Sequence, residues 1–135
     1  MRAVRLSHTI AVPRPFEEAM RAFTPLGERE WVDGWEPVFP AGEPDGDGDD
    51  PETVFEANGA TWVVVDKAFD TVRYARFTPG VMAGTVTVHC APDGEATAAE
   101  VTYALTALSA EGEARLEAFA EGFQAEIDGW AERLH

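Results

Sequence analysis

The segment Thr24 to Pro40, TPLGEREWVDGWEPVFP, holds two of the four tryptophans of the chain and points to its fold more directly than any other segment. Thr24 followed by Pro25 is typical of a helix start. The threonine oxygen accepts a hydrogen bond from a free amide, and proline has no amide that needs a partner. We therefore expect a short helix to begin at Thr24.

The aromatic residues of this segment, Trp31, Trp35 and Phe39, follow one another at a spacing of four. In one unbroken helix this spacing would form a stripe, but Gly34 and Pro37 predict that the chain has already left the helix. We expect the aromatic side chains on a short helix and its exit loop. They either plug one end of the core or line a ligand pocket.

Length and composition predict one domain, residues 1–135, which buries a core without disulfide bonds or a structural metal. The only cysteine, Cys90, has no partner for an internal bridge, and no segment has the pattern of a signal peptide, so we expect a cytoplasmic protein. No apolar run approaches the roughly 20 residues that cross a bilayer, which predicts no membrane insertion.

The formal net charge is -15, from 25 acidic and 10 basic residues. Such a charge repels phosphate backbones and anionic lipids, so nucleic acids and membrane surfaces are poor partners. The sequence contains no glycine-rich phosphate loop, no paired metal histidines and no serine elbow, and we expect no cofactor.

The pattern of apolar residues predicts most of the secondary structure. Alternation over residues 3–12 indicates a half-buried strand with Val4, Leu6, His8, Ile10 and Val12 on its core face. A short amphipathic helix over residues 16–23 follows, and then the helix that begins at Thr24. Five further strands are expected in an antiparallel meander, over residues 53–57, 61–66, 71–78, 81–91 and 99–108.

A long C-terminal helix closes the chain. Ser109 is its expected N-cap, with Glu111 and Glu113 in the first turn and Arg133 and His135 in the last, as the helix dipole favours. One apolar stripe follows the 3.6-residue period: Leu116, Phe119, Ala120, Phe123, Ile127, Trp130, Ala131 and Leu134. The predicted fold class is α+β in the order β-α-α-β-β-β-β-β-α, with a curved antiparallel sheet wrapped around this helix.

This order, together with the segments TPLGE, GWEPVFP, DPETVFE, WVVVD, FTPG and LTALSAEG, resembles the SRPBCC superfamily of START-like, helix-grip proteins. The resemblance spans nearly the whole chain, and the most similar members are small bacterial proteins of the polyketide cyclase or dehydrase type. It implies a cavity between helix and sheet and an apolar ligand such as a lipid or polyketide. No catalytic motif is shared by the superfamily, so the resemblance implies no active residue.

The first functional hypothesis is a binder of a small apolar molecule, monomeric or homodimeric, without enzymatic activity. Its expected ligand-binding residues are Trp31, Trp35, Phe39, Trp62, Tyr103, Phe119 and Phe123. This hypothesis requires a cavity above about 300 Å³ on the helix side of the sheet. The alternatives are an enzyme of the cyclase, dehydratase or hydrolase type, and an interaction module like the heat-shock-protein activator homologues of the superfamily.

Three polar residues are the weak catalytic candidates. His8 shares the core face of the first strand, where it either moves a proton or is a histidine satisfied by backbone or water. Tyr103 lies on the core face of the last strand. Arg76 lies on a strand whose two faces are both mixed. Facing inward it would clamp a carboxylate or enolate, but an exposed arginine among so many acids is the commoner case.

The acidic loop supplies a weak calcium candidate, because Asp45, Asp47, Asp49 and Glu56 stand at the spacing of calcium ligands. The sixth place lacks the expected glycine and no flanking helices are predicted, which favours a solvated loop and no metal site. Two further acids, Glu28 and Glu30, flank the aromatic segment and are expected on a solvated face. Cys90 shares an apolar face and has no basic neighbour, so we expect no nucleophile there.

Overall fold

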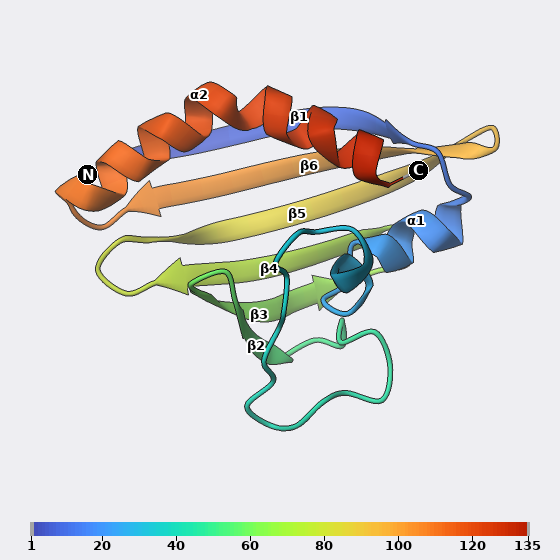
Figure 1. The fold of residues 1–135 in the computed structure, drawn as a ribbon, viewed down its shortest axis with the longest axis horizontal. Coiled ribbons are helices and arrows are strands. Elements are labelled where there is room, and N and C mark those ends of the chain that lie inside the picture. The colour runs from blue at the N-terminus through green and yellow to red at the C-terminus, as the bar shows by residue number, and fades with distance from the viewer. Residues whose placement is uncertain (1, 135) are drawn as a thin grey trace.

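A curved antiparallel sheet of six strands forms the body of the protein in a computed structural model that describes residues 2–134. The strands follow one another in the order β1-β6-β5-β4-β3-β2, so consecutive strands from β2 to β6 are neighbours, as expected of a meander (Figure 1). Their bounds are β1 Ala3–Val12, β2 Val54–Ala57, β3 Ala60–Lys67, β4 Thr71–Thr78, β5 Met82–Asp93 and β6 Ala96–Ala107.

The alternation of apolar residues places one face of the sheet against the helices. In β1, residues Ile10 and Val12 are buried, Val4, Leu6 and His8 are half-buried, and the intervening residues are exposed. This confirms the predicted core face of the strand. The turn between β2 and β3 has positive φ at both Asn58 (52°) and Gly59 (74°), the backbone that a two-residue hairpin needs.

The long helix α2, Ala110–Arg133, lies across the concave face of the sheet and contacts β1 and β6 (Figure 1). Ser109 caps it as predicted, because its hydroxyl accepts a hydrogen bond of 3.1 Å from the Gly112 amide. The predicted apolar stripe is buried or half-buried along its whole length. Gly112 is required at the close approach of the helix to the β4–β5 turn, since a Cβ there would lie 1.9 Å from the Val81 carbonyl oxygen. His135 lies outside the described residues.

Two short helices follow β1. The first is α1, Phe16–Ala22, and the second is a single 3₁₀ turn, η1, Gly27–Glu30. The expectation that the second helix begins at Thr24 is wrong by three residues. Thr24 instead acts ahead of the turn, where its hydroxyl accepts a hydrogen bond of 3.0 Å from the Gly27 amide. The chain then runs out of η1 into an irregular segment that returns along β2, where Val38 and Glu56 form an isolated bridge.

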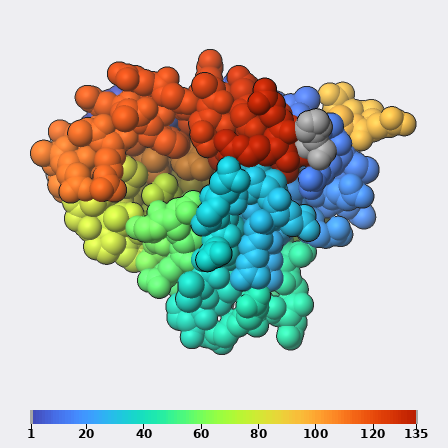
Figure 2. Space-filling view, in the orientation of Figure 1, coloured from blue at the N-terminus to red at the C-terminus, as the bar shows by residue number. Residues whose placement is uncertain are grey.

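The segment around η1 covers the part of the concave face of the sheet that α2 leaves open. Figure 2 shows this segment packed directly against the C-terminal end of α2. The contact is aromatic. The ring centroids of Trp31 and Trp130 lie 5.5 Å apart with an interplanar angle of 66°, and Trp31 also meets Phe23 edge-on with a centroid distance of 5.8 Å. The result is the expected α+β helix-grip layout, with an interior enclosed by sheet, helix and aromatic segment. Among the described residues, no helix combines the length and apolar character that spanning a membrane requires.

Candidate functional site

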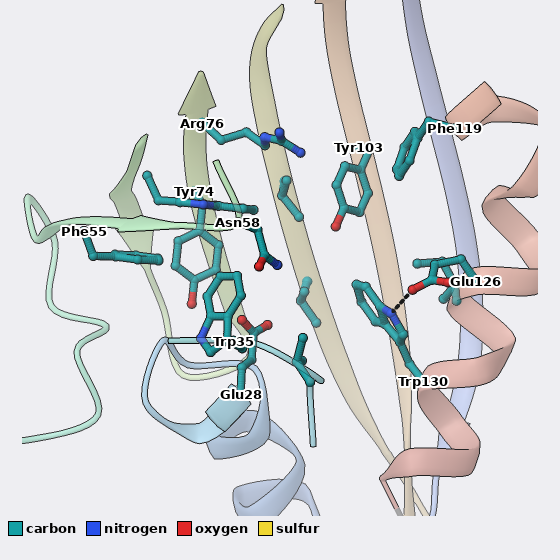
Figure 3. A pocket seen from close by; sticks show the side chains of 15 residues that line it. Glu28, Trp35, Phe55, Asn58, Tyr74, Arg76, Tyr103, Phe119, Glu126 and Trp130 are labelled. Carbon is teal, nitrogen blue, oxygen red and sulfur yellow. Dashed lines mark hydrogen bonds between the residues drawn. The ribbon is translucent and has the colours of Figure 1, made fainter. Parts of the chain in front are cut away.

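A cavity of about 200 Å³ lies between the sheet, α2 and the segment that contains η1 (Figure 3). This volume is below the roughly 300 Å³ that the binding hypothesis set, which counts against that hypothesis for a ligand of lipid or polyketide size. The lining comes from every part of the fold: Glu28, Val32, Trp35, Phe55, Asn58, Trp62, Tyr74, Arg76, Val86, Val88, Tyr103, Phe119, Glu126, Ile127 and Trp130.

Aromatic rings form one wall of the cavity. Trp35 is buried, and its indole nitrogen donates a hydrogen bond of 2.7 Å to the Pro25 carbonyl oxygen. Its ring meets Trp62 and Phe55 edge-on at 5.7 and 6.0 Å, and those two rings are stacked on each other at 5.9 Å. The indole of Trp62 is fixed in the same way by a hydrogen bond of 3.0 Å to Ala57. These bonds and ring contacts hold the wall rigidly in place.

Arg76 faces the cavity, which corrects the expectation of an exposed arginine. The alternation of β4 places it on the same face as Val72 and Tyr74, both buried. Its guanidinium carbon lies 5.1 Å from the centre of the Trp62 ring, so the cation packs over the aromatic face. Its Nε is buried and has no hydrogen-bond partner. Burial lowers the pKa of the guanidinium from its usual value.

Tyr103 reaches the same space from β6, with its hydroxyl directed into the cavity (Figure 3). Its ring is buried against Phe119 and Phe123, at 5.0 and 5.8 Å. Burial is the main reason that its pKa is raised above that of an ordinary tyrosine, and the charge of Glu28 adds to this effect. The hydroxyl is therefore protonated and makes no hydrogen bond to the described residues, which leaves it free to donate to a bound molecule.

Glu28 enters the cavity from η1, so the expectation that it belongs to a solvated face was wrong (Figure 3). Its side chain is half-buried, and burial of the carboxyl raises its pKa well above the usual value. Glu30 of the same turn is exposed, as predicted. Nearby, the hydroxyl of Tyr74 donates a hydrogen bond of 2.7 Å to the Phe23 carbonyl oxygen, which ties the sheet to the end of α1.

Glu28→Gln is expected to stabilise the protein in a pH-dependent way. The unfolded chain releases the Glu28 proton near its ordinary pKa of 4.5, whereas the folded chain holds it to a higher pH. As pH rises through this interval, ionisation of the unfolded state lowers the stability of the wild type. Chemical denaturation should give similar free energies of unfolding for both proteins at about pH 4 and a more stable variant at about pH 8. Glu30→Gln is the control. A difference in free energy of unfolding between Glu28→Gln and the wild type that stays constant across pH would contradict the raised pKa of Glu28.

Several residues predicted to bind ligand lie elsewhere. Trp35, Trp62, Tyr103 and Phe119 line the cavity, whereas Trp31, Phe39 and Phe123 do not. Trp31 instead donates a hydrogen bond of 2.7 Å from its indole nitrogen to Ala22 and joins η1 to α2. Phe39 packs behind the wall on Phe55 at 5.7 Å, and Phe123 packs against both Tyr103 and Phe119. The predicted set therefore divides into a lining group and a supporting group.

His8 does not converge with the other two catalytic candidates. It shares the face of β1 that α2 covers, and its Nε2 lies 2.7 Å from a carboxylate oxygen of Asp128 on that helix. It is absent from the cavity lining, where Arg76 and Tyr103 meet. Of the two interpretations of His8, the structure favours the histidine that is satisfied by a partner.

The calcium candidates are not brought together. Asp49 pairs with Lys67, Asp47 lies 4.0 Å from Arg21, and Glu56 belongs to β2. Within residues 2–134, no three or more acidic, histidine or cysteine side chains form a group able to hold a metal ion. Cys90 is buried as expected, and burial raises the pKa of its thiol to about 11.

The residues missed by the sequence interpretation fall into two kinds. Trp130 and Ile127 belong to the predicted stripe of α2, and the position of Val86 follows from strand alternation, so a signal for them existed. Glu28 and Asn58 carried no such signal. One lies on a turn and the other in a hairpin loop, where periodicity does not indicate a buried face.

Comparison with solved structures reveals three informative likenesses. CalU16 from Micromonospora echinospora has 17% sequence identity and a TM-score of 0.68, over 96% of this chain and 73% of that chain. Ara h 8.0201 has 11% sequence identity and a TM-score of 0.63, over 96% of this chain and 98% of that chain. The Zhui aromatase/cyclase from Streptomyces sp. R1128 has 15% sequence identity and a TM-score of 0.62, over 96% of this chain and 92% of that chain. No protein-family model and no curated protein matches the sequence. The likenesses confirm the fold that the sequence predicted.

Proposed function

We propose that this chain, which has the helix-grip fold of the SRPBCC superfamily, binds one small and largely apolar molecule in the cavity between its sheet and α2. The observation that carries the proposal is the lining itself. Aromatic and aliphatic side chains form most of it, and a few polar groups from separate elements converge on the same space. Apolar walls with a small number of oriented polar groups are typical of small-molecule sites.

The volume limits the size of the ligand. A dry cavity of about 150 Å³ is large enough to bind benzene, so one of about 200 Å³ accommodates a molecule with a single ring. Lipids and molecules with several fused rings exceed this space. The proposed ligand is therefore smaller than the lipids and polyketides that the resemblance implied. A single buried cysteine suits a reducing compartment, and we place this function in the cytoplasm.

A second candidate function is catalysis on the bound molecule. It is favoured by the convergence of Arg76 and Tyr103 on one cavity and by the similarity to an aromatase/cyclase. In this alternative the guanidinium and the phenol would stabilise an enolate oxygen, and Glu28 would hold or release a proton. His8 takes no part, because it pairs with Asp128.

Titration with benzyl alcohol, followed by NMR, tests the proposed function. We expect saturable shifts of methyl groups that line the cavity, at Val32, Val86 and Ile127. Exposed apolar residues on other surfaces, such as Val65 and Phe77, serve as the internal control. Shifts confined to these exposed residues would contradict binding in the cavity and favour the interaction-module alternative instead.

A further inference from the structure

We propose that the bound molecule is a single-ring organic acid, whose carboxylate lies between Arg76 and Tyr103. This inference rests on the proposed function and names the class of ligand for the same cavity. It depends on three observations: the unpaired charge of Arg76, the direction of the two donors, and the size of the space that they share.

Arg76 is a half-buried cation without a compensating anion, and its Nε is fully buried. The chain has 25 acidic residues, and most of its basic side chains form an ion pair with one of them. Among the residues described, Arg76 pairs with no carboxylate, and no carboxylate is among the groups that shift its pKa. Three other arginines pair with no carboxylate among the described residues: Arg5 and Arg73 are exposed to water, and the half-buried Arg14 donates a hydrogen bond of 2.7 Å to the Leu134 carbonyl oxygen. Removing part of a charge from water is costly unless an opposite charge or hydrogen bonds compensate it, so we infer that an anion from outside the chain is the partner of Arg76.

The geometry leaves donors available to that anion. The guanidinium packs over the Trp62 ring, a contact that uses none of its N–H groups as hydrogen-bond donors to a carboxylate. The buried Nε has no acceptor within the protein. The hydroxyl of Tyr103 points toward the same space from two strands away (Figure 3). A planar carboxylate can accept from the guanidinium and from the phenol at once.

The remainder of the cavity fits the rest of such a molecule. Trp35, Phe55 and Trp62 offer flat apolar surface to one ring, and the volume of about 200 Å³ leaves no space for a second fused ring together with a carboxylate. Glu28 lies across the cavity from Arg76 (Figure 3). Burial raises the pKa of its carboxyl, so Glu28 stays neutral to a higher pH than an ordinary glutamate, which reduces its repulsion of an anion.

Calorimetric titration with two matched probes, benzoate and the neutral benzyl alcohol, tests this inference near neutral pH. We expect the wild type to bind benzoate more tightly. Arg76→Met should weaken benzoate binding by roughly tenfold or more, because charge-assisted hydrogen bonds are lost, and should change benzyl alcohol binding by less than about threefold. Arg73→Met is the control, since Arg73 lies on the same strand and faces outward. It should leave both affinities unchanged.

Tyr103→Phe provides a second variant that removes only the hydroxyl, in case Arg76→Met does not fold. It should weaken benzoate binding about fivefold and weaken benzyl alcohol binding less, because the lost hydrogen bond is charge-assisted only for the carboxylate. Equal affinity of the wild type for the two probes would overturn the anion inference and leave the proposed function standing. An equal loss of affinity for benzoate and benzyl alcohol in folded Arg76→Met would also overturn the anion inference. Failure of both probes to bind the wild type would overturn the proposed function, and this inference with it.

Discussion

Trp35→Ala is expected to lower the free energy of unfolding by about 3–5 kcal/mol, the range of large aromatic truncations in protein cores. Trp35 is only 6% exposed, and its ring contacts both Phe55 and Trp62. Its indole nitrogen also holds the Pro25 carbonyl oxygen, which would lose its partner. The variant should lose probe binding as well, because the same ring forms a wall of the cavity.

Chemical denaturation with matched variants measures this effect. Phe39→Ala is the control, because Phe39 is half-buried behind the wall and contacts Phe55 from outside the cavity. It should cost clearly less stability than Trp35→Ala. If Trp35→Ala lowers the free energy of unfolding by less than about 1 kcal/mol but still abolishes binding, Trp35 is not part of the structural core. The segment would then be a detachable lid.

Much of the fold could be predicted because its strongest signals are local. Alternation in β1 and β6 and the 3.6-residue stripe of α2 each reflect one buried face, and each is confirmed. The cap at Ser109 is predictable because its hydroxyl accepts a hydrogen bond from the Gly112 amide, only three residues away in the sequence. The Thr-Pro signal predicts a helix start at Thr24, although the hydrogen-bonded turn forms only from Gly27.

The polar part of the site was harder to predict, because it depends on tertiary contacts. Both faces of β4 carry mixed residues, and the inward direction of Arg76 is set by the neighbouring Trp62 and by the cover of α2 and the η1 segment. Glu28 is adjacent to Arg29 in the sequence and has the pattern of a surface residue, yet the turn directs it inward. The aromatic segment was predicted as either a plug or a lining. Trp31 serves the first role and Trp35 the second.

Val86→Phe is expected to abolish binding by filling the cavity. Val86 is buried on β5 and lies in register between Tyr74 and Tyr103, so a larger side chain there occupies the centre of the lined space. Overpacking in a filled core costs about 1–3 kcal/mol, but the added ring here enters existing space, so we expect a cost at the lower end of that range. The matched control is Val63→Phe, since Val63 lies on the opposite face of the sheet.

The most direct test of ligand binding in this cavity is calorimetric titration of the wild type, Val86→Phe and Val63→Phe with benzyl alcohol. We predict one binding site in the wild type and in Val63→Phe, with affinity at least about tenfold weaker or undetectable in folded Val86→Phe. Equal binding to all three proteins would contradict the account, because the molecule would then bind outside the space that the new ring fills. Absence of binding to the wild type would contradict it as well.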